Sequence, residues 1–336
     1  MIEARFYKKL EEKKVNCLLC PHQCIINSGK RGICGVRENR DGVLFSLVYG
    51  KAVSWAVDPI EKKPLYHFLP GEDAFSFATG GCNLSCLNCQ NYTISQLPKK
   101  SREIPGENIS PEKILKLTKK GGAKIIAYTY TEPTIFYEYA FDTCRLSHQE
   151  GIKNVFVTNG YIMPSALEEI SPFLDGANVD LKSIKEEFYR KICGARLEPV
   201  LDTIKLMKKL GIWVEVTTLV IPGLNDTDEE FKAIAEFIAS IDEGIPWHVS
   251  RFYPAYKMQH YPPTPVETLK KAIKIGKKVG LKYIYIGNVP GEETENTFCP
   301  NCGKIIIKRS GFWVERVDIK EGRCRFCKTE IEGVWE

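Results

Sequence analysis

The sequence predicts an α/β protein whose centre is a partial (β/α)6-type TIM barrel. Short strands alternate with helical stretches from about residue 75, which is typical of parallel βα units. The chain has 336 residues, enough for one such barrel with attached modules. Eleven of its 13 cysteines fall into three tight clusters, one before, one within and one after the alternating region. We therefore expect a cysteine-rich module at 1–72, the barrel at 73–290 and a zinc-ribbon-like module at 291–336.

The first module carries four cysteines in the spacing C-x2-C-x3-C-x9-C, namely Cys17, Cys20, Cys24 and Cys34. Alternating apolar stretches at 43–48 and 52–57 predict strands in the same module. Closely spaced thiols in a chain that starts without a secretory pattern indicate a metal site rather than disulfides. Zinc and an auxiliary 4Fe–4S cluster both accept four cysteines, so the spacing leaves both open.

The central region alternates strands with helices in a regular order. We expect strands at 75–79, 124–130, 154–158, 177–180, 213–220 and 247–252, and a seventh at 283–286. Helical patterns lie between them at 111–120, 229–241 and 266–279. Six or seven such units in about 215 residues suit an incomplete barrel better than a complete barrel of eight units.

The second cysteine cluster follows the first central strand as Cys82-Asn-Leu-Ser-Cys86-Leu-Asn-Cys89. Three thiolates can hold three irons of a 4Fe–4S cube and leave the fourth iron open to a ligand. A zinc site completed by a distant histidine is the alternative. The remaining two cysteines, Cys144 and Cys193, stand alone and are expected in the core, with a late-acting thiol as the second interpretation of Cys193.

The tail carries the third cluster, in which two C-x2-C pairs are separated by 21 residues. Its members are Cys299, Cys302, Cys324 and Cys327. Closed sites of four cysteines are typically structural zinc sites, so zinc is the first expectation. Rubredoxin-like iron is the second, because the same four thiolates fit it.

The three-cysteine loop and the motifs around it resemble those of the radical S-adenosylmethionine (radical SAM) superfamily. Within it, the chain is similar to pyruvate formate-lyase activating enzyme and, more closely, to the radical SAM member of the AmmeMemoRadiSam system. The closer similarity rests on Asp58-Pro-Ile-Glu-Lys-Lys-Pro-Leu-Tyr-His-Phe, Tyr128-Thr-Tyr-Thr-Glu-Pro and Trp247-His-Val-Ser-Arg-Phe-Tyr-Pro. The resemblance covers about residues 15 to 290.

The resemblance implies an oxidoreductase with a 4Fe–4S cluster on Cys82, Cys86 and Cys89. Such a cluster binds S-adenosylmethionine and cleaves it reductively to a 5′-deoxyadenosyl radical, which abstracts a hydrogen atom from the substrate. The substrate is unidentified, and a protein or peptide residue or a small molecule would suit the resemblance. It also implies a reductant protein of the flavodoxin or ferredoxin type. No catalytic residue is assigned beyond the groups that bind the cofactors.

The resemblance further implies which strand-end residues contact S-adenosylmethionine. Glu132 stands where relatives bind the ammonium, although Tyr130 and Thr131 replace the usual glycine pair. Lys182 matches a lysine that could meet the carboxylate, and Asp180 could meet the ribose. Other matching positions are Thr158, Asn159, Gly160, Leu219 and Arg251. All of these positions follow the carboxyl ends of successive predicted strands, which face one mouth of a parallel barrel.

Composition excludes several classes of protein. The net charge is +5, from 47 Lys and Arg against 42 Asp and Glu, and no basic run stands out, so nucleic acid is not an expected partner. No apolar run reaches about 18 residues, so neither a membrane span nor a membrane partner is expected, and the cytoplasm is the predicted location. The alternative function is a zinc-binding module for nucleic acid or protein, without radical chemistry.

Overall fold

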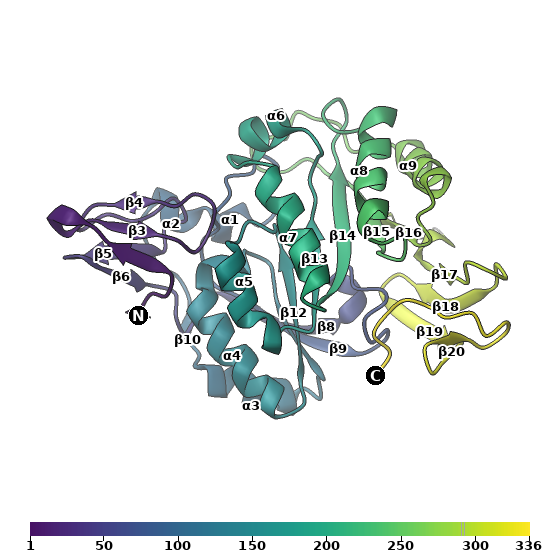
Figure 1. Ribbon diagram of the computed structural model, residues 1–336, viewed down its shortest axis with the longest axis horizontal. Coiled ribbons are helices and arrows are strands. Elements are labelled where there is room, and N and C mark those ends of the chain that lie inside the picture. Colours follow the sequence, from purple (N-terminus) through teal and green to yellow (C-terminus); the bar gives the residue numbers. More distant parts are fainter. Residues whose placement is uncertain (290, 292) are drawn as a thin grey trace.

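The computed structural model describes residues 1–289, 291 and 293–336 and is centred on one eight-stranded sheet (Figure 1). The strand order is β16-β15-β14-β13-β12-β11-β9-β8. Every neighbouring pair from β9 to β16 is parallel, and β8 alone pairs antiparallel. The strands are β8 (Ser54–Pro59), β9 (Asp73–Ala78), β11 (Ile125–Tyr128), β12 (Lys153–Thr158), β13 (Gly176–Asp180), β14 (Trp213–Val220), β15 (Trp247–Arg251) and β16 (Ile284–Gly287). The predicted α/β class is thus confirmed.

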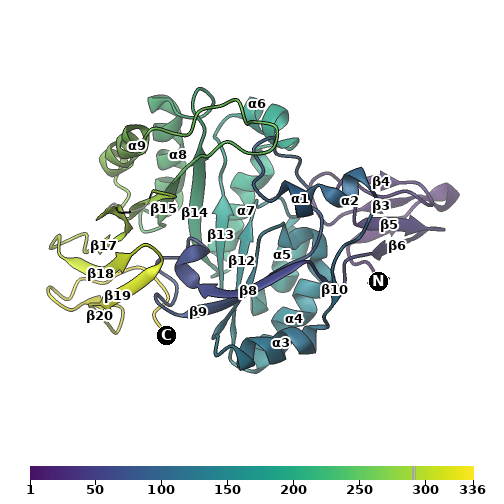
Figure 2. The same cartoon turned by 180° about the vertical axis from the view of Figure 1, so that it is seen from behind.

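Helices connect the parallel strands and lie on one face of the sheet (Figure 1), while Figure 2 shows the opposite face. They are α3 (Pro111–Lys120), α4 (Tyr137–Gln149), α5 (Pro164–Ile170), α6 (Glu186–Phe188), α7 (Glu198–Lys209), α8 (Asp228–Ile241) and α9 (Val266–Val279). The Ser110 hydroxyl caps α3 by accepting the Lys113 N–H, and the Thr227 hydroxyl caps α8 through the Glu230 N–H. In the described part of the chain, no helix is both long and apolar enough to cross a membrane.

The parallel strands lie where the apolar runs predicted them, to within two residues at each end. Their side chains are buried on both faces, as for Ile125, Ile126 and Ala127 of β11. Burial on both faces is typical of parallel sheets covered by helices, and it explains why the runs read as continuously apolar. The seventh strand, expected at 283–286, is β16.

The stretch at 52–57 is different from its prediction. We expected it in the cysteine-rich module, but its main part forms β8, which pairs with β9 from Ser54 opposite Ala78 to Pro59 opposite Asp73. The apolar stretch correctly predicts a strand, but its burial does not alternate, since Trp55, Ala56 and Val57 are all exposed. The sequence pattern does not specify the partner of this strand. The connection through residues 60–72 is short enough to place β8 antiparallel at the edge of the central sheet.

The segment before β8 forms small antiparallel sheets at one end of the molecule (Figures 1 and 2). One sheet contains β1 (Ile2–Glu3), β6 (Val43–Ser46) and β5 (Arg37–Arg40), and another contains β2 (Tyr7–Lys9), β3 (Val15–Cys17) and β4 (Ile25–Ile26). A third pairs β7 (Lys51–Ala52) with β10 (Glu107–Asn108). Two short helices, α1 (Tyr92–Ser95) and α2 (Leu97–Lys100), follow the three-cysteine loop beside them.

The tail forms a second small β module at the opposite end of the long axis (Figures 1 and 2). Its strands are β17 (Thr297–Phe298), β18 (Ile305–Ser310), β19 (Trp313–Val317), β20 (Ile319–Lys320) and β21 (Arg323–Cys324). Pro290, where we predicted the barrel to end, lies outside the described residues. Single helical turns complete the chain at Glu11–Lys13, Ile60–Lys62, Pro133–Phe136, Ser171–Phe173, Tyr189–Cys193 and Glu293–Glu295.

A buried carboxylate near the amino ends of the strands holds the segment between β8 and β9 in place. Glu215 of β14 accepts the backbone N–H groups of Tyr66 and His67 at 3.0 and 2.8 Å. Its second contact is His248 of β15, whose Nε2 lies 2.6 Å from Oε2. These bonds satisfy a carboxylate that is completely buried, which would otherwise cost several kcal/mol.

The tail module is bound to the same network. The His67 ring lies 2.6 Å from both the Tyr285 hydroxyl and the Glu332 carbonyl oxygen. Arg309 of β18 donates to the Tyr66 carbonyl at 2.7 Å and pairs with the buried Glu61. These contacts leave His67 fully buried between the sheet and the tail.

We predict that His67 makes folding sensitive to mild acid. Burial lowers the pKa of His67 from 6.5 to about 4, so the unfolded chain binds this proton more readily than the folded one. The resulting stability is complete above pH 6.5 and is lost as the pH falls toward 4. Between pH 7 and pH 5 the loss from this residue is about 2 kcal/mol. Denaturant unfolding followed by tryptophan fluorescence at both pH values measures it, and His67→Gln should lack this part of the difference. An unchanged pH dependence in that variant would contradict the prediction.

Candidate functional site

A cavity lies at the carboxyl ends of the parallel strands and is open to the three-cysteine loop. Each strand from β11 to β16 contributes a residue at or just after its end. These residues are Thr129, Thr158, Asp180, Leu219, Ser250 and Asn288. Because side chains from successive strand ends meet at one edge, groups far apart in the sequence share one space. Residues at the ends of six successive strands therefore line one cavity.

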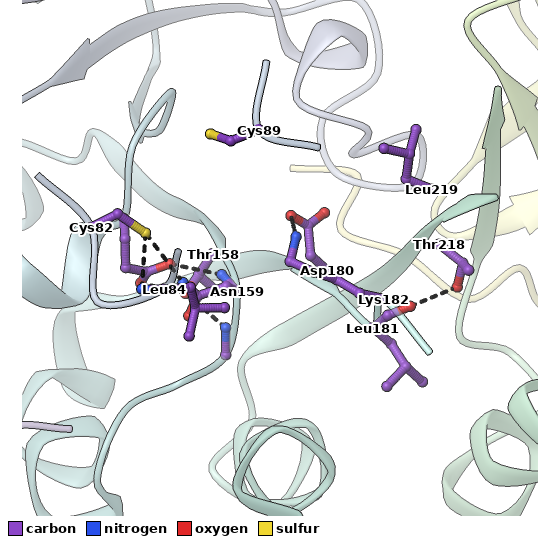
Figure 3. Close-up of polar contacts among 12 residues, drawn as sticks. Cys82, Leu84, Cys89, Thr158, Asn159, Asp180, Leu181, Lys182, Thr218 and Leu219 are labelled. Carbon is purple, nitrogen blue, oxygen red and sulfur yellow. Dashed lines mark hydrogen bonds and ion pairs between the residues drawn. The ribbon is translucent and has the colours of Figure 1, made fainter. Parts of the chain in front are cut away.

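The loop after β9 presents Cys82, Cys86 and Cys89 to this cavity, and all three are half-buried. Two backbone bonds fix its middle, because Ser85 and Leu87 donate to carbonyl oxygens of residues 193 and 192 at 2.8 and 3.0 Å. Figure 3 shows Cys82 and Cys89 at separate points of the opening, with the Asp180 carboxylate directed toward the same space. Three thiols that are held apart suit a cluster better than one ion.

The Cys86 thiol has an unusual neighbour in Cys193, one of the two cysteines outside the clusters. Cys193 is completely buried, as expected for a core cysteine, and so is Cys144. A hydrogen bond from the Cys193 thiol lowers the pKa of Cys86 to about 7. In contrast, burial raises the pKa of Cys82. The structure thus favours the thiolate, which is the metal-binding form, at Cys86.

Glu132 connects the ends of β11 and β12. Its Oε1 accepts the Thr134 N–H, the Thr134 hydroxyl and the Thr158 hydroxyl at 3.0, 2.7 and 2.7 Å. Its Oε2 accepts the Asn159 N–H at 2.8 Å. Burial raises the pKa of Glu132, although these four hydrogen bonds favour the carboxylate. Oε1 is fully used by the protein, whereas Oε2 retains capacity for another donor from the cavity, which Glu132 lines.

Asn159 joins the end of β12 to the cysteine loop. Its side-chain amide donates to the Asn83 Oδ1 at 2.9 Å and approaches the Cys82 sulfur at 3.7 Å (Figure 3). Its own Oδ1 accepts the Tyr161 N–H at 2.9 Å. With both ends of the amide engaged, Asn159 acts mainly by holding the first cysteine in position.

Asp180 and Lys182 follow β13 as a polar pair in the cavity (Figure 3). The ammonium lies 2.7 Å from the carboxylate. Burial works against the charged lysine, but the adjacent Asp180 and thiols leave the pKa of Lys182 well above its usual value. The site therefore offers a permanent positive charge, and the Asp180 carboxylate is 38% exposed and can accept further donors.

Two of the predicted positions do not line the cavity. Gly160 turns the chain after β12 with φ of 70° and packs against Val179, so its role is in the turn. Arg251 ends β15, but its guanidinium donates to the Thr264 carbonyl oxygen at 2.8 Å. Neighbouring Ser250 takes the place at the cavity that we expected for Arg251. The alternation along β15 puts these two side chains on opposite faces.

The cavity also has a basic floor that the sequence analysis did not assign. Lys63 is 2% exposed and lies 2.8 Å from the Asp58 carboxylate, which also accepts the Tyr130 hydroxyl at 2.8 Å. Lys63 lines the cavity together with Lys62 and Tyr130. Lys62 and Lys63 belong to the stretch from Asp58 to Phe68, which is one of the motifs that carry the family resemblance. The sequence did not show that part of this stretch lines the cavity.

The four tail cysteines converge in the way a single metal ion requires. The sulfur atoms of Cys299, Cys302, Cys324 and Cys327 all lie within 4.8 Å of one another. Among the described residues, no other group of three or more His, Cys, Asp or Glu side chains gathers so closely. Tetrahedral zinc with bonds of about 2.3 Å places its sulfurs about 3.8 Å apart, so the quartet has nearly the spacing of a zinc site.

The four cysteines of the first module surround a second, smaller cavity. Cys17, Cys20, Cys24 and Cys34 all line it. This cavity is adjacent to the three-cysteine loop, because Gly81 lies against the carbonyl oxygen of Cys34 and the side chain of Val36. Gly81 has φ of 106°, so a side chain at this position would be strained as well as crowded.

Comparisons with known proteins agree with this geometry. The model of the radical SAM superfamily matches residues 77–238. An uncharacterised protein of Methanocaldococcus jannaschii is 48% identical over 337 residues, which is 99% of this chain and 100% of the relative. The pyruvate formate-lyase-activating enzyme of Clostridium pasteurianum is 25% identical over 181 residues, covering 50% of this chain and 72% of that enzyme. A solved radical SAM methyltransferase from Sphaerobacter thermophilus has the same fold, with a TM-score of 0.50, 13% identity and coverage of 65% of this chain and 67% of that one.

We predict that Gly81→Ala destabilises the protein by about 2 kcal/mol or more. The added methyl carbon would lie 2.7 Å from the Val36 side chain and 3.2 Å from the Cys34 carbonyl oxygen. The matched control is Gly211→Ala, which also has a positive φ, 79°, but has nothing within 4 Å of the added atom. That control should lose only about 1 kcal/mol, from backbone strain. Denaturant unfolding compares the two, and equal losses would mean that the cysteine loop and the first module are not tightly packed.

Proposed function

Because the chain belongs to the radical SAM superfamily, we propose that it is an oxidoreductase that cleaves S-adenosylmethionine reductively on a 4Fe–4S cluster held by Cys82, Cys86 and Cys89. The observation that carries the proposal is the position of these thiols. They open onto a cavity formed by the carboxyl ends of the parallel strands, whose lining includes the Glu132 carboxylate and the Lys182 ammonium, two charges suited to the two ends of a zwitterionic ligand. The proposed architecture is a partial (β/α)6-type barrel between the two cysteine modules.

The residues of the cavity fit these cofactors. Three thiols in one loop can bind three irons and leave the fourth open. Two buried polar atoms of cavity residues, Asn88 Oδ1 and Thr217 Oγ1, have no hydrogen-bond partner within the described part of the chain. Such groups are uncommon in folded proteins and favour a polar ligand in the cavity.

When bound, the reduced cluster supplies the electron that breaks the sulfonium C–S bond and yields a 5′-deoxyadenosyl radical. The chain itself binds and orients. Glu132 Oε2 accepts the ammonium of S-adenosylmethionine, and Lys182 faces its carboxylate. Thr158, Asn159, Asp180 and Leu219 complete the strand-end contacts, while Gly160 shapes the turn and Arg251 supports the rim. The enclosure of these groups excludes water, which strengthens each charged contact.

The substrate is a protein or peptide residue or a small molecule that enters the same cavity. The basic floor at Lys63 favours a substrate with an acidic or carbonyl group on that side, because this buried ammonium lines the cavity. A flavodoxin- or ferredoxin-type protein delivers the electron in the cytoplasm. The four tail cysteines hold a structural zinc ion, which the close spacing of their sulfur atoms supports.

The first prediction tests the cluster. Cys86→Ala in the anaerobically reconstituted full chain should abolish the cleavage of S-adenosylmethionine to 5′-deoxyadenosine, because two thiolates cannot hold the cube with one open iron. Liquid chromatography of the product measures cleavage, and absorption near 400 nm measures the cluster. Cys144→Ala is the matched control, because that thiol is buried in α4 away from the cavity. Normal cleavage by Cys86→Ala would refute the assignment, and zinc alone in the wild-type protein would support a non-enzymatic zinc module.

The second prediction concerns the two charges that hold S-adenosylmethionine. Glu132→Gln should weaken its binding by about 30-fold or more, since a buried charged contact is worth roughly 2–5 kcal/mol. Lys182→Met should have a smaller effect, because the Lys182 side chain is 18% exposed and water can take the place of its ammonium.

Equilibrium binding to the cluster-loaded protein measures both, with iron content as the check that the cluster is intact. Glu187→Gln serves as control, since its carboxylate is 72% exposed, pairs with Lys191 and does not line the cavity. Wild-type affinity in both site variants would show that these groups are structural.

A further inference from the structure

We propose that Cys17, Cys20, Cys24 and Cys34 hold a second 4Fe–4S cluster rather than a zinc ion. The sequence alone left both possibilities open, because four cysteines can close either site. Three features of the structure decide between them: the spacing of the thiols, a buried guanidinium beside them that has two unused N–H donors, and their position next to the Cys82 loop.

The spacing separates this site from the tail site. A zinc ion draws four sulfurs to about 3.8 Å from one another, and the tail quartet already has nearly this arrangement. In the first module, all of which is described, no three of the four thiols come within 4.8 Å of one another. They surround a common cavity instead. In a cube each sulfur binds a different iron, so its ligands stand further apart than the ligands of one ion.

The chemistry of the cavity also fits a cluster. Besides the thiols, its walls are mainly apolar, with Leu19, Ile26 and Ile135 among them. A dry, apolar shell protects a cube from solvent and helps to set its potential. Two of the thiols, Cys17 and Cys34, are buried, whereas Cys20 and Cys24 are partly accessible. The partly accessible side gives an entry for electrons from outside.

Arg37 supplies the most specific evidence. It lines the same cavity, is 2% exposed, and uses Nη2 to bind Glu138 at 2.9 Å. Its Nε and Nη1 have no hydrogen-bond partner anywhere in the described chain. The Glu138 carboxylate pairs with the charge of Arg37, but the two unused buried N–H donors still lack hydrogen-bond acceptors. The sulfides and thiolates of a cube provide several such acceptors, and hydrogen bonds to them raise its potential.

The position next to the Cys82 loop gives the site a function. His22, between Cys20 and Cys24, lies 2.9 Å from the carbonyl oxygen of Asn83 in that loop. The segment after β11 forms the wall between the two cavities, with Glu132 on one side and Thr134 and Ile135 on the other. In this role, which rests on the proposed function, the second cluster accepts one electron from a flavodoxin- or ferredoxin-type donor. It then passes this electron to the Cys82 cluster and returns to its oxidised state.

Metal analysis of the full chain, reconstituted anaerobically with ferrous iron and sulfide, tests the site. The wild-type protein should contain about eight irons and eight sulfides with one zinc. A variant with Cys82, Cys86 and Cys89 all changed to Ala should keep about four irons. The double variant Cys20→Ala/Cys24→Ala should lose about four, whereas Cys144→Ala should lose none. Two zinc ions and no iron in the triple variant would overturn the proposal, as would full iron content in the double variant.

The same measurements separate this site from the proposed function. If the Cys82 loop held no cluster, the wild-type protein would contain about four irons, all of them lost in the double variant. If a variant fails to fold, electron paramagnetic resonance of the dithionite-reduced wild-type protein decides instead. Two cluster signals are expected, of which S-adenosylmethionine changes one. A single signal, with about four irons and two zinc ions per chain, would overturn the proposal.

The relay role has its own test. In the Cys20→Ala/Cys24→Ala variant, the loss of S-adenosylmethionine cleavage is compared for two reductants. The fold-loss with reduced flavodoxin should exceed the fold-loss with dithionite by more than about tenfold. The reason is that the small reductant can reach the Cys82 cluster directly, whereas a protein donor docks at the surface. Equal losses with both reductants would show that electrons do not pass through this site.

Discussion

The Glu132 carboxylate is the buried charge on which the arrangement of the site depends. Four hydrogen bonds converge on it, from the segment that follows β11 and from the end of β12. These bonds fix Asn159, and Asn159 in turn holds Asn83 and Cys82. The same turn places Thr134 and Ile135 against the cavity of the first module. One buried carboxyl group thus links the strand ends, the three-cysteine loop and the neighbouring thiols.

The opposite end of the sheet is organised by the same physical rule with different partners. Glu215 is buried without exposure and is satisfied by backbone groups of the segment between β8 and β9 and by His248. Both carboxylates follow from the requirement that a charge removed from water must find donors. Because Glu215 acts on the segment that also reaches the cavity floor at Lys63, the support of the fold and the shape of the site are coupled through residues 58–68.

The sequence predicted much of this fold because its strongest signals are local. Parallel strands buried on both faces give continuous apolar runs, so these elements were found with their order. Polar residues at strand ends then predicted one shared mouth. Pairing between distant segments was not available from such patterns. Three features depend on contacts between distant segments that no local period encodes. They are the antiparallel position of β8, the burial of His67 under the tail, and the hydrogen bond of Arg251 to the Thr264 carbonyl oxygen. The spacing of the first four cysteines likewise could not distinguish one ion from a cube, and the two unused donors of Arg37 became evident only in the fold.

The contact between His67 and Glu332 spans 265 residues of the chain, and it determines when the fold can be completed. A chain is made from its amino end, and contacts of such sequence separation form late because they must close a long loop. The amino ends of the strands therefore remain uncovered while the first ninety residues, with seven of the 13 cysteines, are already available. Iron and sulfide can reach those thiols before the tail docks, so the order of synthesis would separate loading of the two proposed iron sites from closure of the sheet.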